Sequence, residues 1–338
     1  MYRFRARNAA EMMKLVYPAL RMEGVMEASR NGPVLPFNQP VCLEYVRPYE
    51  KVVLCPVRDA NPFFHLMEGI LMLSGHNDVE WLSYFNAGMR RYSDDGFRFN
   101  AFYGERLRRN DGDQLTACAA ILANDPTSRQ AVANIWHPVD LYQDTLDKAC
   151  NLSIVFAVNN GCVDMTVFNR SNDAIWGSVS GANVVHFAMF QEYVAAVAGY
   201  PVGSYYQISN NLHVYVDNPQ TTALLNHYKH GMDGIEEYPL IDPILLRGDS
   251  KEQFDDETAR FVKMTKQLIG GGVPPGLLDG RFKSRFYQGT AEPMFNAWFG
   301  RKSKLLNPTE VQAMINQVRA TDWCQAASEW VDRRECAR

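Results

Sequence analysis

A cysteine and an arginine twenty residues apart could supply a reactive thiolate. Cys150 precedes the apolar segment 152–158, and Arg170 follows a second apolar segment, 162–168. Residues 159–161 (Asn-Asn-Gly) lie between the segments and favour a type I′ hairpin turn. Such a hairpin brings Arg170 back beside Cys150, where a guanidinium lowers the pKa of the thiol and favours the nucleophilic thiolate. A buried structural thiol near a surface arginine is the alternative, and the spacing alone fits both equally.

Three residues could bind an anion such as phosphate. Arg170 and Ser171 are adjacent, and Arg30 lies in a Ser-Arg-Asn-Gly-Pro turn whose backbone N–H groups could face the same ligand. A guanidinium can donate to two phosphate oxygens at once. A lone arginine in a turn is more often a solvated surface residue, so the turn by itself does not establish a site at Arg30.

Two carboxylates could handle protons or bind a second substrate. Glu68 lies in the middle of the apolar segment 62–73, and a carboxylate is costly to bury there unless it has a partner. This position favours a general acid–base with a raised pKa over a helix glutamate that reaches solvent. Asp173 could cap a turn, pair with Arg170 or bind a second substrate.

Three polar residues further along the chain could recognise a base and a sugar. The amide of Asn183 offers both a donor and an acceptor to a pyrimidine edge, and His213 and Tyr215 could hold a sugar hydroxyl. Taken singly, each is more often an ordinary hydrogen-bonded side chain. His227 and His230 have no cysteine nearby, so the sequence predicts no metal site. Phosphate-binding loops and serine-hydrolase motifs are absent from the sequence.

Helical and strand patterns alternate without a regular β-α-β rhythm, which predicts an α+β fold. The break GGGVPPG at 270–276 suggests a main domain over 1–270 and a divergent segment, loop plus helix, over 271–338. The patterns predict helices at 8–21, 62–73, 114–123, 184–198 and 308–319, and strands within 41–55, 130–136, 152–168, 202–208 and 213–217.

The composition predicts a soluble protein. Of 338 residues, 46% are hydrophobic and the net charge is −4, so no overall positive field attracts nucleic acid. Seven cysteines without a CxxC pair fit a reducing compartment. Without a signal-peptide core or a membrane-spanning apolar run, the expected location is cytoplasmic, or the host cytoplasm if the protein is viral.

The combined motifs resemble one family. Residues 169–173, followed by Gly177, look like an Arg-Ser-x-Asp-x-x-x-Gly signature, and Leu212-His213-Val214-Tyr215 looks like a His-x-Tyr motif. Residues 102–104 and 127–129 look like two further family segments. From about Arg30 to Tyr215 the chain resembles thymidylate synthase and the related pyrimidine-nucleotide hydroxymethylases. The resemblance implies a mixed sheet packed by helices in a three-layer single domain.

The resemblance also implies a mechanism. Cys150 would add to C6 of the pyrimidine, with Arg170 stabilising its thiolate, and C5 would then take a methylene group from 5,10-methylenetetrahydrofolate. Glu68 and Tyr103 would move protons through water. In the same way, Asn183 would bind the base, His213 and Tyr215 the sugar, and Asp173 the folate. The phosphate would be bound by Arg30, Arg170 and Ser171. The resemblance also implies a homodimer, in which Arg129 of the partner chain would complete the phosphate site.

Several departures from the family favour water over hydride as the final reactant. Thymidylate synthases usually have a Trp-rich segment where this chain has residues 86–92, a histidine where it has Asn151 and an arginine where it has Gln130. They usually end in an apolar segment, whereas this chain ends in Arg-Arg-Glu-Cys-Ala-Arg. An altered lid and aromatic wall would admit water, which predicts hydroxymethylation. Thymidylate synthesis proper and a noncatalytic nucleotide-binding relative are the alternatives.

The choice of base depends on the length of segment 178–182. Counting forward from Gly177 places Gly181 at the base-reading position, whereas counting back from His213 places Asn183 there. A two-residue insertion would reconcile the counts in favour of Asn183, because Asn at this position in the family suits uracil. The sequence thus favours dUMP, with dCMP or CMP possible substrates.

Overall fold

The computed structural model describes residues 1–229, 238–246, 248–272 and 276–336. His230 therefore lies outside the described residues. The chain forms two compact units. The first contains Met1–Ala60, Gln114–Asp140 and Ala149–Tyr238, and the second contains Asn61–Asp113, Leu141–Lys148 and Pro239–Arg338. The predicted division at 270/271 stays a prediction.

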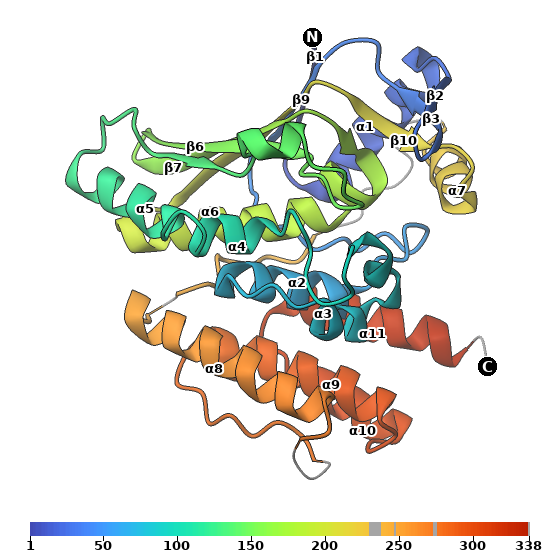
Figure 1. Ribbon diagram of the computed structural model, residues 1–338. Helices are drawn as coiled ribbons and strands as arrows, with labels where there is room; N and C mark the ends of the chain where they lie inside the picture. The colour runs from blue at the N-terminus through green and yellow to red at the C-terminus, as the bar shows by residue number, and fades with distance from the viewer. Residues whose placement is uncertain (230–237, 247, 273–275, 337–338) are drawn as a thin grey trace. The chain divides into compact units, whose positions relative to one another are not determined.

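A mixed six-stranded sheet forms the centre of the first unit (Figure 1). The pairs β1–β4 and β7–β9 are parallel and the other neighbours are antiparallel. In order across the sheet the strands are β1 (Tyr2–Ala6), β4 (Val41–Tyr45), β9 (Val202–Ser209), β7 (Cys162–Asn169), β6 (Asn151–Asn159) and β5 (Val132–Asn134). With the helices described below, this mixed sheet confirms the α+β class.

The predicted hairpin is present and its turn has the expected geometry. Asn159 pairs with Cys162, so only Asn160 and Gly161 form the loop. Both have positive φ, 51° and 75°, as a type I′ turn requires. Alternate side chains of β6 and β7, such as Phe156 and Met165, are fully buried, and this alternation fixes the register of the pair.

A second sheet carries part of the predicted site. Strand β10 pairs antiparallel with β3 and parallel with β8. The order is β2 (Glu27–Ser29), β3 (Gly32–Pro36), β10 (Leu212–Tyr215) and β8 (Asn172–Asp173). Only two residues, Arg170 and Ser171, separate the end of β7 from the start of the short strand β8. The same stretch of chain therefore links the reactive hairpin to the sheet that contains His213.

The α-helices of the first unit, in its described residues, are α1 (Ala9–Glu23), α5 (Gln114–Asn124), α6 (Ala182–Ala198) and α7 (Pro219–His227). Figure 1 shows α5 and α6 along one face of the six-stranded sheet, where α6 packs on β7 and β9. Helix α6 is buried along most of its length, as its nearly all-apolar sequence requires. It ends at Gly199, whose φ of 81° stops the helix.

The second unit is helical in its described part. It contains α2 (Pro62–Ser74), α3 (Val79–Phe85), the 3₁₀ turn η1 (Ala87–Tyr92), α4 (Tyr103–Arg108), α8 (Lys251–Ile269), the π-turn η4 (Tyr287–Ala291), α9 (Glu292–Lys302), α10 (Pro308–Ile315) and α11 (Thr321–Glu335). None of the helices in the described ranges is long and apolar enough to cross a membrane.

Two of the sequence predictions need correction. The strand pattern over 41–55 gives a strand only at Val41–Tyr45. Residues 52–55 are buried without joining a sheet, because Pro48 interrupts the run and their apolar side chains fill the core as irregular chain. The helix expected at 308–319 ends at Ile315, since Asn316 caps it.

Candidate active site

Cys150 and Arg170 lie side by side at the open end of the hairpin. The Arg170 backbone N–H donates to the Cys150 carbonyl at 2.9 Å. Its Nε donates to the Ala149 carbonyl at 2.8 Å, and its Nη2 lies 3.6 Å from the Cys150 Sγ. One of these short bonds holds the Arg170 backbone and the other holds its guanidinium, so the third contact directs positive charge at a half-buried sulfur. This arrangement favours the thiolate, the nucleophilic form.

Trp136, which the sequence analysis did not identify, contacts the Arg170 guanidinium. The guanidinium carbon of Arg170 lies 5.9 Å from the centre of the Trp136 ring, within the range of a cation–π contact. Trp136 follows β5, the edge strand that pairs with β6. The tryptophan comes from the segment after β5 and not from the hairpin, so local spacing gave no signal of it.

Strands β8 and β10 bring Asp173 and His213 opposite each other. His213 is buried, and its Nδ1 lies 2.7 Å from the Asn211 Oδ1. Burial lowers the pKa of His213 to about 4, so the ring is neutral at physiological pH. The Tyr215 ring packs edge-on against His213 with 5.2 Å between centroids. The predicted sugar-binding pair therefore forms one local cluster.

Asp173 begins the turn that follows β8. Its Oδ1 accepts from the Ile175 and Trp176 backbone N–H groups at 2.6 and 3.1 Å, which caps the π-turn η3 (Ala174–Ser178). Burial nevertheless raises the pKa of Asp173 to about 6, against the lowering effect of these bonds and of Arg58. The carboxylate is therefore ionised at neutral pH and titrates in mildly acidic solution.

Arg58 is a second cation that the sequence did not identify. It is buried, donates from Nε to the Ile175 carbonyl at 3.2 Å, and places its guanidinium carbon 4.3 Å from the centre of the half-exposed Trp176 ring. Burial lowers its pKa. An arginine directly after the apolar run 52–57 was the available signal. Its charge adds to the field around Asp173.

The loop between β8 and α6 determines which residue presents an amide. Gly181 has no side chain, and a Cβ there would lie 1.9 Å from the Trp176 carbonyl carbon. Asn183 lies two residues later, in the first turn of α6. Its Nδ2 is 3.4 Å from the Asn172 Oδ1 and 3.5 Å from the Asn151 Oδ1. This geometry supports Asn183 over Gly181 as the base-reading residue.

Buried tyrosines hold that loop in place. The Tyr17 hydroxyl lies 2.6 Å from the Ser180 Oγ, and the Tyr45 hydroxyl donates to the Ser178 carbonyl. Both tyrosines are essentially fully buried. The connection between Gly177 and Asn183 is therefore an ordered part of the first unit.

The other predicted phosphate ligands lie on exposed loops or next to Arg170. Ser171 follows Arg170 directly. Arg30 is exposed in the turn between β2 and β3, and Arg129 is exposed in the loop between α5 and β5. No hydrogen bond or ion pair is recorded for either arginine within the described ranges. Ser171 is thus adjacent to Arg170 in the chain, and no contact within the described ranges joins Arg30 or Arg129 to Cys150.

Glu68 and Tyr103 occur together in the second unit. Glu68 is buried in α2, and Tyr103 begins α4, which packs on α2. The contact is close because Gly104 has no side chain: a Cβ there would lie 2.3 Å from the Met72 carbonyl oxygen. Met72 is one helical turn after Glu68. The role of these two residues toward Cys150, which belongs to the first unit, stays a prediction.

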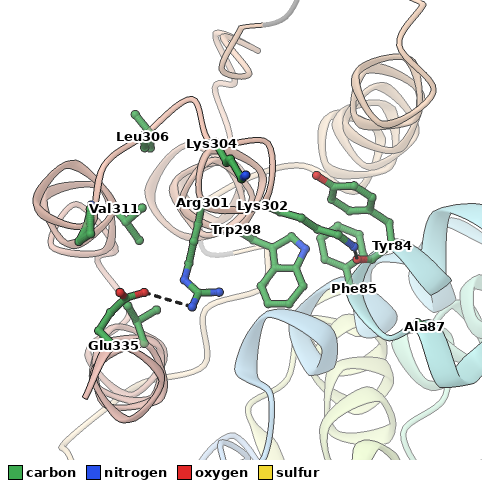
Figure 2. A pocket seen from close by; sticks show the side chains of 12 residues that line it. Tyr84, Phe85, Ala87, Trp298, Arg301, Lys302, Lys304, Leu306, Val311 and Glu335 are labelled. Carbon is green, nitrogen blue, oxygen red and sulfur yellow. Dashed lines mark hydrogen bonds and ion pairs between the residues drawn. The ribbon is translucent and has the colours of Figure 1, made fainter. Parts of the chain in front are cut away.

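The second unit also has a pocket of about 600 Å³, which Figure 2 shows from close by. Aromatic rings of Tyr84, Phe85 and Trp298 line it. Arg301 pairs with Glu335 at 3.2 Å, so this cation is already engaged. None of the residues predicted for the active site lines the pocket. Among the described residues, no group of three or more His, Cys, Asp or Glu is arranged to hold a metal ion.

The α+β fold with a cysteine held beside a guanidinium is an arrangement that suits covalent catalysis through sulfur. Comparison with known proteins gives its family. The family model described as Thymidylate synthase matches residues 59–260. The chain belongs to the thymidylate synthase family.

Three relatives illustrate the similarity. A deoxyuridylate hydroxymethyltransferase of Pseudomonas phage M6 is 38% identical over 98% of this chain and 94% of that protein. A deoxyuridylate hydroxymethyltransferase of Bacillus phage SP01 is 38% identical over 64% of this chain and 60% of that protein. A thymidylate synthase of Haloferax volcanii is 32% identical over 33% of this chain and 32% of that protein.

Proposed function

We propose that the protein transfers a one-carbon unit to C5 of dUMP and yields 5-hydroxymethyl-dUMP. One observation carries this proposal: the similarity to the phage M6 deoxyuridylate hydroxymethyltransferase extends over 98% of this chain. The similarity to the Haloferax volcanii thymidylate synthase covers 33%. The departures in residues 86–92 and at Asn151 support the same choice of product.

The geometry around Cys150 supports the first chemical step. The thiolate sulfur, held near the Arg170 guanidinium at 3.6 Å, forms a bond with C6 of the uracil, and C5 becomes the nucleophile. Methylenetetrahydrofolate supplies a methylene group at the oxidation level of formaldehyde. The C5 proton is then lost, tetrahydrofolate leaves, water adds to the methylene carbon, and the bond from sulfur to C6 breaks. Glu68 and Tyr103 are the proposed carriers of the protons.

The surroundings of Asp173 fit a folate. A pterin ring presents N–H donors, and a carboxylate that already caps a turn through Oδ1 is fixed in orientation. The buried Arg58 and the half-exposed Trp176 beside it add a cation and an aromatic surface. These residues would hold the folate in the proposed complex, and Asp173 would bind it only while ionised.

This gives a pH prediction. Because the pKa of Asp173 is about 6 in the folded protein, the KM for methylenetetrahydrofolate should rise about tenfold between pH 7 and pH 5. The stability that this group contributes changes with pH in the opposite direction: it is present below the ordinary pKa of 3.8 and is lost as pH rises through about 6.

Steady-state kinetics across this pH range would measure the effect. Asp173→Asn is the control, because it should raise the KM for the folate and remove its pH dependence. A wild-type KM that does not change between pH 5 and 7.5 would contradict the assignment of Asp173.

A homodimer is part of the proposal. Arg129 is exposed and has no partner recorded within the described ranges, which suits a residue that completes the phosphate site of a second subunit together with Arg30, Arg170 and Ser171. The predicted cytoplasmic location, or the host cytoplasm if the protein is viral, is likewise retained as a proposal.

The product decides between the proposal and its alternatives. Purified protein is incubated with methylenetetrahydrofolate and, separately, with dUMP, dCMP, UMP and CMP, and products are identified by mass spectrometry. The expected result is 5-hydroxymethyl-dUMP with tetrahydrofolate. A 5-methyl product with dihydrofolate would make the protein a thymidylate synthase, and turnover of dCMP without turnover of dUMP would refute the base assignment.

A further inference from the structure

Five side-chain amides form a closed ring of hydrogen bonds beside Cys150. They come from five elements: Asn151 (β6), Asn169 (β7), Asn172 (β8), Asn183 (α6) and Gln207 (β9). All except Asn183 are buried, with at most 3% of their surface exposed. Buried amides need partners for both the oxygen and the nitrogen, and here the amides supply most of these partners to one another.

The bonds run in one direction along both arms of the ring. In the first arm, Asn183 Nδ2 donates to Asn151 Oδ1 at 3.5 Å, Asn151 Nδ2 donates to Asn169 Oδ1, and Asn169 Nδ2 donates to Gln207 Oε1 at 3.0 Å. In the second arm, Asn183 Nδ2 donates to Asn172 Oδ1 at 3.4 Å, and Asn172 Nδ2 donates to Gln207 Oε1 at 3.2 Å. Asn183 is thus the double donor and Gln207 the double acceptor.

The hydrogen bonds of this ring can run in only two directions: from Asn183 to Gln207, as in the structure, or from Gln207 to Asn183. If one of Asn151, Asn169 or Asn172 turned over alone, it would place two oxygens or two nitrogens face to face. Reversal must therefore include the whole ring, after which Gln207 would donate to both arms and Asn183 would accept from both. Because Gly177 lacks a Cβ, which would lie 2.1 Å from the Asn172 Oδ1, the second arm has room to close.

The direction of these hydrogen bonds determines whether the amide oxygen or the amide nitrogen of Asn183 is available to a ligand. In the structure its Nδ2 faces into the ring, and no partner is recorded for its Oδ1 among the described residues. In the reversed ring the nitrogen would face outward. A uracil base carries a donor at N3, whereas a cytosine base carries an acceptor there.

We propose that the amide ring holds Asn183 with its oxygen toward the substrate, so that it accepts the N3–H of uracil and disfavours cytosine. This inference rests on the proposed function, because it takes Asn183 as the base-reading residue. Gln207 is then a positioning residue: it is fully buried and acts on the base only through the ring.

Three variants test the role of Gln207. Gln207→Met removes the oxygen that accepts from both Asn169 and Asn172. The direction of the hydrogen bonds is then no longer fixed at this end of the ring, and the amide of Asn183 can rotate by about 180°. Gln207→Glu keeps an acceptor toward Asn169 and Asn172. Gln191→Met is the matched control, because Gln191 is also fully buried in the first unit but donates to the Val163, Gly203 and Ser204 carbonyls outside the ring.

The measurement is the Kd for dUMP and for dCMP by titration calorimetry, with thermal unfolding recorded in parallel. In Gln207→Met the preference for dUMP over dCMP should fall about tenfold or more, since a mispaired buried group costs that much binding. Gln207→Glu and Gln191→Met should keep the wild-type preference, even where their melting temperatures fall.

Each result is decisive. If Gln207→Met keeps the wild-type preference, or Gln191→Met loses it equally, the ring does not set the specificity. A wild-type protein that prefers dUMP but forms no product would refute the proposed reaction and leave the ring intact. A wild-type protein that prefers dCMP, or binds neither nucleotide, would overturn both.

Discussion

Cys150→Ala should abolish turnover and leave dUMP binding nearly unchanged. The alanine removes the atom that forms the bond with C6, and loss of a catalytic nucleophile typically lowers kcat by at least about 10⁴-fold. The contacts of Arg170 with the Cys150 and Ala149 carbonyls involve the backbone, so the guanidinium should stay in place. Release of tritium from dUMP labelled at C5 measures the loss, and calorimetry measures the binding.

Cys162→Ala is the matched control for this experiment. Cys162 lies at the other end of the same hairpin, paired with Asn159, and is similarly part-buried. The variant should release tritium at the wild-type rate. If Cys150→Ala releases tritium as fast as the wild type, Cys150 is not the nucleophile. If the wild-type protein binds dUMP but releases no tritium, the protein is a noncatalytic nucleotide-binding relative.

The sequence predicted those parts of the fold and site that depend on local pattern. The Asn160-Gly161 turn, with an apolar segment on each side, was enough to predict that Arg170 lies beside Cys150, although a register shift between Asn151 and Ser153 adjusts the final pairing. Gly75, which has a φ of 66°, ends α2, and Gly199 ends α6, so these helix ends also depend on a residue next to the helix in the chain. Each of these features depends on residues that are close in the chain.

Features assembled from distant segments were not predicted. Gln207 lies in a strand with an ordinary pattern of alternating buried and part-exposed residues, and nothing in that pattern indicates a role for it. In the structure it nevertheless joins both arms of the amide ring. Arg58 looks like a chance charge after an apolar run, and only the fold shows that it bonds to the Ile175 carbonyl and lies over the Trp176 ring. In both cases the partners are more than thirty residues away, and hydrophobic periodicity carries no information about which buried polar groups will meet.

Arg170→Met should lower kcat/KM for dUMP by about 10³-fold, because it removes both the charge at the sulfur and a proposed phosphate ligand. Arg170→Lys should recover only a small part of the activity. An ammonium keeps the charge, but it cannot donate at once to the Ala149 carbonyl and toward the Cys150 Sγ as the planar guanidinium does.

Alkylation by iodoacetamide separates the two roles of Arg170. If the guanidinium stabilises the thiolate, the pH at which Cys150 becomes reactive should move upward in Arg170→Met without any nucleotide present. Weaker dUMP binding would report the loss of the phosphate contact separately. Arg21→Met is the control, since Arg21 contacts the Asn226 side chain on the surface of the first unit. An unchanged alkylation profile in Arg170→Met would limit Arg170 to phosphate binding and leave the reactivity of the thiol without its proposed cause.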